Sequence, residues 1–349
     1  MLKPLYGVIK LYVILKHTNT DQQKGIDIMA NTSLHAAKDA KNDEFYTRLE
    51  DINEEMNHYE DKFRGKVVFC NCDDPKWSNF WKYFHLNFEY LGLKKLITTH
   101  YEPGEVQSYK IEYTGGNDED FEEGTITPLE QNGDFRSDEC IALLDEADIV
   151  VTNPPFSLAR DYIDVLSKHN KLFLIIGDLN WITYKEMFAL LQSNEMWLGY
   201  NSVKSFIQPD GTIKKFGNKL WFTNIDIKKR HNLLDTTYYY SKKDSLYPEL
   251  YPKYDNYNAI NVDKVKEIPM DYTGVMGVPI TFMNQYNPDQ FEILGFMDRQ
   301  DDVNGLKTKV YTKSDCSNYN DLNRCGAIVV DGQLKSVYMR IFVRRKAGE

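Results

Sequence analysis

The chain has 349 residues, of which 42 % are hydrophobic and 27 % are charged, and its net charge is −10. These values are those of a globular protein, and they exclude a disordered chain, a collagen-like fibre and a coiled-coil rod. No apolar run reaches the roughly 18 residues that a membrane helix needs. Five cysteines are too few for a disulfide scaffold, so we expect a cytoplasmic protein that has no membrane partner.

The charged residues are unevenly distributed along the chain. There are 15 acidic and 2 basic residues between Glu102 and Asp148, whereas there are 9 basic and 3 acidic residues between Lys204 and Lys243. A basic segment in an acidic protein predicts a local surface that faces phosphate groups. The alternative is a solvated basic surface that binds no ligand, and the charges alone do not decide between the two.

The first 28 residues differ in character from the rest of the chain. Residues 2–14 are apolar and residues 17–24 are polar, but the apolar run is too short for a signal peptide. A more ordinary N-terminus begins at Met29. We interpret residues 1–28 as an extension from an upstream start codon, or as a segment that is not native. The alternative is a weak docking helix.

Helical and strand patterns alternate from residue 49 to residue 225. We expect helices at about 49–63, 78–91, 137–146, 158–166 and 183–191, and strands at 67–72, 95–99, 148–152, 171–177 and 220–225. Continuous apolar strands that alternate with helices are typical of a doubly wound, mostly parallel sheet with helices on both faces. The acidic segment 101–132 is expected to be a surface excursion. Beyond residue 227 the chain is rich in tyrosine and is expected to form a loop-rich second domain.

The sequence Asn153-Pro154-Pro155-Phe156 follows directly after a predicted buried strand. Ligands of open α/β sheets bind at this edge, where the parallel strands end. Proline fixes its own backbone and favours an extended conformation in the residue before it. The Asn153 side-chain oxygen and the Pro154 carbonyl oxygen can therefore form a rigid pair of hydrogen-bond acceptors beside an aromatic ring.

This pair of acceptors suits a planar ring that carries an amino group. The ring would stack on Phe156, and the two amino hydrogens would be donated to the two oxygens. This localises the nitrogen lone pair, so that the nitrogen can attack an electrophilic methyl group, and it stabilises the positive charge that develops. The alternative is a simple Pro-Pro turn, but such a string arises by chance in only about one or two chains in a hundred of this length.

Three other segments are candidates for the methyl-donor site. Asp73 and Asp74 follow the first predicted strand, and Asp134 with Phe135 precedes a predicted helix. The segment from Phe45 to Thr47 can pack on the donor from the N-terminal side. The alternatives are a strand-end turn for the first pair and a helix N-cap for Asp134.

The Cys70-x-Cys72 spacing lacks a second pair of cysteines or histidines, so we expect no metal site.

Several ordered stretches together resemble the EcoRI modification methylase family, which consists of adenine-specific DNA methyltransferases. The resemblance begins at about Met29 and continues to the C-terminus. The stretches that carry it are Asn42–Thr47, Lys66–Pro75, Gly133–Ser137, Asp148–Ser157, Phe173–Gly177, Ile182–Glu186, Tyr251–Tyr257 and Gly274–Phe282.

The resemblance implies a Rossmann-like class I methyltransferase fold and methyl transfer from S-adenosylmethionine to N6 of adenine in duplex DNA. It implies a catalytic domain at residues 29–227 and a target-recognition region at residues 228–349. Its catalytic motif corresponds to Asn153, Pro154, Pro155 and Phe156. The donor-site segments correspond to Phe45, Thr47, Asn71, Asp73, Asp74, Asp134 and Phe135.

The resemblance also implies partners and leaves alternatives. We expect a monomer on duplex DNA that flips out its target base, with a cognate restriction endonuclease acting separately. The basic residues Lys228, Lys229 and Arg230 are expected to contact phosphates. The alternatives are a methyltransferase of RNA or of protein glutamine that shares the same motif, or a DNA-binding relative without catalytic activity.

Overall fold

The computed structural model describes residues 45–72, 74–104, 106–120, 122–208, 210–297 and 303–346. Asp73 and residues 1–28 lie outside the described residues, so the predictions for them are not addressed by the fold.

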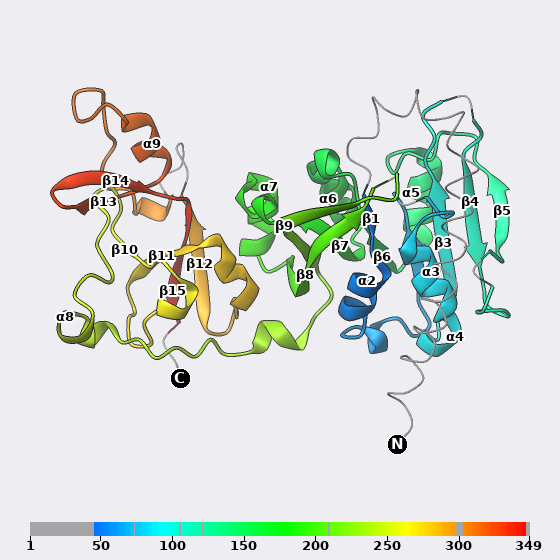
Figure 1. Ribbon diagram of the computed structural model, residues 1–349, viewed down its shortest axis with the longest axis horizontal. Coiled ribbons are helices and arrows are strands. Elements are labelled where there is room, and N and C mark those ends of the chain that lie inside the picture. The colour runs from blue at the N-terminus through cyan, green and yellow to red at the C-terminus, as the bar shows by residue number, and fades with distance from the viewer. Residues whose placement is uncertain are drawn as a thin grey trace, which may run out of the picture.

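In the part of the chain that the structure describes, the main body is a nine-stranded sheet with the order β1-β8-β9-β7-β6-β2-β3-β4-β5 (Figure 1). The strands are β1 Tyr46–Thr47, β2 Val67–Cys70, β3 Lys95–His100, β4 Tyr109–Tyr113, β5 Thr125–Pro128, β6 Ile149–Thr152, β7 Leu172–Asp178, β8 Trp197–Ile207 and β9 Ile213–Thr223.

The four central strands β3, β2, β6 and β7 are parallel to one another, and the outer strands pair antiparallel. The expectation of a mostly parallel sheet is therefore corrected to a mixed sheet. The reason is that β3, β4 and β5, and likewise β8 and β9, follow one another through connections too short for a parallel crossover.

Helices cover both faces of the central strands. The helices on one face are α2 Leu49–Met56, α3 Asn79–Leu86 and α4 Phe88–Leu91, and those on the other are α5 Asp138–Glu146, α6 Ala159–Lys168 and α7 Lys185–Gln192. Alternate residues of β2 serve the two faces: Val68 packs with the first group, whereas Phe69 packs with the second. Both side chains are fully buried. This two-sided burial confirms the interpretation of continuous apolar strands.

The predicted helices and strands up to residue 191 are confirmed, with shifted ends. The first helix stops at Met56 and is followed by a 3-10 turn at Glu60–Lys62, although the apolar Tyr59 and Phe63 remain fully buried. The predicted strand at 220–225 is the end of the longer β9. None of the helices in the described ranges is long and apolar enough to cross a membrane.

The C-terminal region contains a separate four-stranded sheet in the order β10-β11-β15-β12. Its strands are β10 Ile260–Asn261, β11 Val275–Pro279, β12 Phe291–Phe296 and β15 Arg340–Arg345; the helices α8 Lys243–Leu246 and α9 Tyr319–Arg324 and the hairpin of β13 Gly326–Val330 and β14 Gln333–Val337 surround it. Two tyrosines of this region are buried and hydrogen-bonded within it: the Tyr251 hydroxyl donates to the Glu267 carbonyl at 2.6 Å, and the Tyr254 hydroxyl donates to Asn261 Oδ1 at 2.7 Å.

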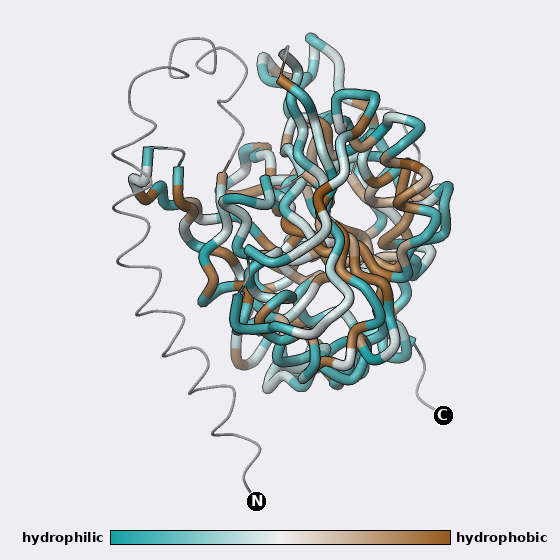
Figure 2. The backbone as a smooth tube through the Cα atoms, turned by 90° about the vertical axis from the view of Figure 1, so that its right-hand side faces the viewer, coloured by the Kyte–Doolittle hydropathy of each residue, from teal (hydrophilic) through white to brown (hydrophobic). Residues whose placement is uncertain are grey.

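The two sheets lie side by side, with α7 between them (Figure 1). The rings of Phe188 on α7 and Phe296 on β12 are 5.4 Å apart, and Gln192 Nε2 donates to the Ile293 carbonyl at 3.1 Å. Figure 2 shows hydrophobic residues concentrated in the strands at the centre of the molecule. The C-terminal region is therefore packed on the main body and continues its core.

Candidate active site

The Asn153–Phe156 motif follows β6 at the carboxyl edge of the parallel strands. The chain passes from β2 to β3 on one side, whereas β6 lies on the other side of β2. The ends of β2 and β6 therefore flank the switch point at which open α/β sheets bind ligands. The Thr152 hydroxyl donates to the Asn71 carbonyl, and the Tyr162 hydroxyl donates to Asn71 Oδ1. The first hydrogen bond joins the ends of β6 and β2, and the second joins α6 to the end of β2.

The side-chain amide of Asn153 is oriented by the segment that precedes β1. Its nitrogen Nδ2 donates to the Phe45 carbonyl at 2.6 Å, and the residue is only 7 % exposed. Because the nitrogen is held on Phe45, the amide oxygen Oδ1 points to the other side of the amide group. Phe45 thus positions Asn153 through its backbone, a role that no side-chain pattern in the sequence can indicate.

Phe156 is the centre of a group of rings that we call the aromatic cluster: Phe45, Phe156, Trp181, Phe206 and Phe216. The ring of Phe156 lies 6.3 Å from that of Phe45, 6.3 Å from that of Trp181 and 6.2 Å from that of Phe206. The ring of Phe216 is 5.0 Å from that of Phe45. Three of these five residues follow the motif by 25 residues or more, and no local pattern in the sequence links them to it.

A buried ion pair lies against the ring of Phe156. The Lys219 ammonium is 3.9 Å from the ring centroid and 2.7 Å from Asp178 Oδ2, and the Lys219 side chain is only 6 % exposed. Asn218 Nδ2 also donates to Asp178 Oδ2, at 2.8 Å. Asp178 ends β7 and is the cross-strand partner of Lys219 on β9. The carboxylate neutralises the ammonium, and the ammonium holds the ring by a cation–π contact.

Thr47 has a buried hydroxyl beside the motif. The residue is 1 % exposed, and its Oγ1 has no hydrogen-bond partner among the described residues. The Thr47 carbonyl, in contrast, accepts a hydrogen bond from Asn79 Nδ2 at 2.7 Å. A buried hydroxyl without a partner destabilises the fold unless a ligand supplies the missing hydrogen bond. This supports a ligand site next to Asn153, beside β1.

Asp74 is held by two neighbours at the ends of β2 and β3. Its Oδ1 accepts from the Lys76 backbone N–H at 2.9 Å, and its Oδ2 lies 3.2 Å from His100 Nδ1. Burial alone would raise the pKa of this carboxyl, but the hydrogen bonds and charges of His100 and Lys76 outweigh burial and hold the pKa below its ordinary value. Asp74 is therefore a stable carboxylate at neutral pH.

Asp134 forms a two-pronged ion pair with Arg136. Its Oδ1 accepts from Arg136 Nε at 2.9 Å and its Oδ2 from Arg136 Nη2 at 2.8 Å, so that the guanidinium holds the pKa of Asp134 below its ordinary value. The N-cap of α5 is Ser137, whose side chain accepts from the Cys140 N–H. Asp134 is therefore not the helix cap that was considered as its alternative role. Phe135 is 5 % exposed and packs against Tyr162.

The Asp74 and Asp134 segments converge at the end of β3. Gly133 has a positive φ of 76°, and a Cβ atom there would lie 2.3 Å from the His100 carbonyl oxygen. This close contact brings the Asp134 loop against the residue that holds Asp74. Glu102 lies in the same place: its N–H donates to the Asn132 carbonyl at 3.0 Å. Glu102, two residues after the second parallel strand, is a further candidate that the sequence pattern did not single out.

Comparison with known proteins identifies the family. Residues 33–346 match the family described as adenine-specific methyltransferase EcoRI. The chain is 48 % identical to the type II methyltransferase M.EcoRI of Escherichia coli over 76 % of its own length and 89 % of the relative. It is 40 % identical to M.MpnI of Mycoplasma pneumoniae (80 % and 90 %) and 38 % identical to M.MgeORF184P of Mycoplasma genitalium (85 % and 98 %), both also named type II methyltransferases.

The chain belongs to the EcoRI family of adenine-specific methyltransferases. This membership confirms the resemblance and the prediction of an adenine-specific DNA methyltransferase. No solved structure matches the chain.

The basic cluster Lys228–Arg230 of this methyltransferase lies away from Asn153. Because β9 runs antiparallel to β7, its last residue Thr223 pairs with Leu174 near the start of β7. The cluster follows at that amino edge of the parallel strands, opposite the motif. Lys229 Nζ donates to the Gly199 carbonyl at 2.5 Å, and burial lowers the pKa of Lys229.

The other two members of the cluster differ in exposure. The Arg230 guanidinium lies 3.7 Å from the centroid of the Trp197 ring, and Arg230 Nη2 donates to Asn194 Oδ1 at 3.3 Å. Lys228 is exposed. Two of the three residues predicted to contact phosphates are therefore engaged with β8 or with the turn before it.

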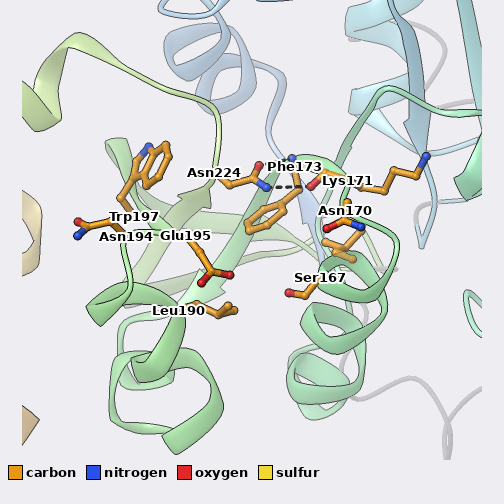
Figure 3. A pocket seen from close by; sticks show the side chains of 10 residues that line it. Ser167, Asn170, Lys171, Phe173, Leu190, Asn194, Glu195, Trp197 and Asn224 are labelled. Atoms are coloured by element: carbon orange, nitrogen blue, oxygen red, sulfur yellow. Dashed lines mark hydrogen bonds between the residues drawn. The ribbon is translucent and has the colours of Figure 1, made fainter.

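A pocket of about 310 Å³ also lies at the amino edge (Figure 3). Ser167 and Asn170 from the end of α6, and Asn194 and Glu195 from the turn after α7, line it. Asn224 Nδ2 donates to the Lys171 carbonyl at 2.8 Å on its wall. The pocket lies at the amino edge of the parallel strands and Asn153 at the carboxyl edge, so the pocket does not belong to the methyltransferase site. Among the described residues, no group of three or more His, Cys, Asp or Glu side chains is placed to hold a metal ion.

Proposed function

We propose that this adenine-specific methyltransferase transfers a methyl group from S-adenosylmethionine to N6 of an adenine that is flipped out of duplex DNA. The catalytic residues are Asn153, Pro154, Pro155 and Phe156. The observation that carries the proposal is the orientation of Asn153: its amide nitrogen donates to the Phe45 carbonyl, so its oxygen faces away from Phe45, as an acceptor for an amino group at the switch point requires.

The residues of the motif act on the amino group of the target base. Asn153 Oδ1 and the Pro154 carbonyl each accept one N6 hydrogen, and Phe156 stacks on the base. S-adenosylmethionine supplies an electrophilic methyl group. The N6–methyl bond forms as the bond between the methyl group and sulfur breaks. The two oxygens stabilise the positive charge on N6 until one of its protons is transferred to water. No strongly basic side chain is required before the attack.

The donor site is proposed to include Phe45, Thr47, Asn71, Asp73, Asp74, Asp134 and Phe135. The buried Thr47 hydroxyl without a described partner fits a polar part of the donor. Asp134 holds Arg136 with both oxygens, but a carboxylate has about four lone-pair sites and can accept a further bond from the adenine amino group of the donor. We add Glu102 for the ribose, because an acidic residue near the end of the next strand commonly binds ribose hydroxyls.

We also propose the larger organisation of the enzyme. Residues 29–227 form the catalytic domain, with the four parallel strands as the core of a Rossmann-like class I fold, and residues 228–349 form the target-recognition region. A stacked and paired adenine cannot reach a strand end, so the base must be flipped. The enzyme acts as a monomer on DNA in the cytoplasm, and a cognate restriction endonuclease acts separately.

The test is methyl transfer from labelled S-adenosylmethionine to unmethylated plasmid DNA, to RNA and to total protein in parallel. The products are hydrolysed and separated by chromatography. We expect the label in N6-methyldeoxyadenosine from the duplex alone. Label in methylcytosine, in RNA or in protein at a comparable rate would contradict the proposal.

A further inference from the structure

The hairpin of β8 and β9 is longer than the strands beside it (Figure 1). Asp178 ends β7 and pairs with Lys219, whereas β9 begins at Ile213. At about 3.4 Å per residue, the hairpin continues for roughly 20 Å past the end of β7. Hydrogen bonds from the Gln208 N–H to the Thr212 carbonyl and from the Gly211 N–H to the Gln208 carbonyl, both 2.8 Å, close its tip. This projecting part lies at the same edge of the sheet as Asn153.

The projecting part is basic. Lys204 on β8 and Lys214 and Lys215 on β9 are exposed, and none of them forms an ion pair with the described residues. Asp210 is the one acidic residue between Lys204 and Lys219. Three exposed lysines on so short an element repel one another, so this arrangement favours a polyanionic partner.

One of the lysines, Lys214, is connected to the surroundings of the catalytic motif by a specific contact. The Lys214 ammonium lies 4.8 Å from the centroid of the Phe45 ring, which belongs to the aromatic cluster. Lys215 is the cross-strand partner of Ser205, and Arg48 Nη1 donates to Ser205 Oγ at 3.4 Å. A second basic residue, next to β1, thus reaches the same part of the hairpin. The charge is therefore placed beside the base-binding motif and not merely somewhere on the surface.

We propose that the β8–β9 hairpin is an arm that binds the phosphate backbone of the duplex next to the flipped adenine, through Lys204, Lys214 and Lys215. This inference rests on the proposed function, because it assumes that the substrate is duplex DNA. Phosphate contacts fix the position of a protein on DNA without reading its sequence. The arm thus holds the duplex while the C-terminal region reads the bases.

The test compares two double variants by fluorescence anisotropy on labelled duplexes over a range of salt concentrations. Lys204→Gln/Lys215→Gln changes the arm and leaves Lys214 on the Phe45 ring. Lys94→Gln/Lys168→Gln is the control, because it removes the same charge from exposed lysines at the amino edge of the sheet. It differs from the arm variant in one respect, because Lys168 is paired with Asp164 at 2.5 Å. Affinity falls with salt, and each lost phosphate contact lowers the magnitude of the slope of log affinity against log salt by about 0.9. We expect the arm variant to lower this slope by up to about 2 and the control to leave it unchanged.

The affinity loss should be equal on cognate and scrambled duplexes. An unchanged slope in the arm variant, with a steep slope in the wild type, would overturn the proposal and leave the proposed function standing. Absence of any wild-type binding to DNA would instead contradict the proposed function. A third outcome would also overturn the proposal: neutralising Lys228, Lys229 and Arg230 lowers the salt slope, whereas the arm variant keeps the wild-type slope. The phosphate contacts would then lie at the amino edge of the sheet. If the double variant is unfolded, the two single variants are expected to lower the slope by about 1 each.

Discussion

At the scale of single residues, the proposed methyl transfer depends on the amide of Asn153. Asn153→Ala removes one of the two acceptors for the amino group, so we expect methylation to fall by about 10²-fold or more, as when another preorganised polar contact is lost. S-adenosylmethionine binding, measured by titration calorimetry, should remain within a factor of two to three. Unchanged turnover in this variant would show that Asn153 has no catalytic role.

The ion pair of Lys219 and Asp178 gives a second prediction at this scale. Each partner neutralises the other in a poorly exposed place, so removing one leaves a charge without its counter-charge. Lys219→Met and Asp178→Asn should each lower the free energy of unfolding, and the double variant should lower it by less than the sum. We expect a coupling of about 1–2 kcal/mol from urea denaturation of the four proteins. Strictly additive losses would mean that the two groups do not stabilise each other.

The pKa of Asp74 predicts a pH dependence. Its value in the folded protein lies below the ordinary 3.8, because His100 and the Lys76 N–H outweigh the effect of burial. A depressed pKa contributes stability that is fully present above the ordinary value and is lost as the pH falls through the folded value. Asp74→Asn should therefore be less stable than the wild type between pH 5 and 7, and the difference should shrink below pH 3.8. A difference that is constant down to pH 3 would contradict this.

At the scale of elements, the junction of β3 with the Asp134 loop depends on Gly133. A Cβ atom at this position would meet the His100 carbonyl oxygen at 2.3 Å, and φ is positive. Gly65 has a similar φ of 71° but nothing within 4 Å of its Cβ position, so Gly65→Ala is the matched control for backbone strain alone. That strain costs about 1–2 kcal/mol. We expect Gly133→Ala to lower the free energy of unfolding, measured by denaturation, clearly more than Gly65→Ala does. It should also weaken donor binding, measured by calorimetry. Equal losses of stability in the two variants would show that the close contact is unimportant.

The sequence predicted the central elements well, and the outer strands poorly. The strands β2, β6 and β7 are continuous apolar runs because helices cover both of their faces, and such runs are visible in a sequence. β5 is exposed along its whole length, so it has no burial pattern to recognise. β8 was missed because irregular pairing between Leu198 and Ser202, and between Val203 and Ser205, breaks the alternation of its side chains.

Only the part of the candidate site that is contiguous in the sequence was predictable. The Asn153–Phe156 motif is a local string, and it is recognisable because its residues act together. Phe206, Phe216 and Lys219 reach the motif only through the pairing of β9 with β7 and β8. Lys228, Lys229 and Arg230 form a basic string that is obvious in the sequence, but the direction of β9 carries them to the far edge. The edge of the sheet at which a charged segment lies depends on the strand topology, which a local sequence pattern does not determine.

At the scale of the whole molecule, the acidic protein has two basic parts that can meet DNA. One is the β8–β9 arm, and the other is the C-terminal region, in which residues 303–346 contain nine basic and three acidic side chains. The family match spans residues 33–346 and thus includes both parts. An acidic body has little general attraction for DNA, so binding should concentrate on these two surfaces. In the proposed division, the arm holds the duplex and the C-terminal region reads it.

The most direct measurement of the central claim is a map of N6-methyladenine in the genome of a host without its own adenine methylation. The host expresses either the wild type or Asn153→Ala, at equal protein levels. The account predicts N6-methyladenine in one short sequence context in wild-type cells, and its near absence in cells with the variant. Methylation of another base or another atom, or equal N6-methylation by the variant, would contradict the account.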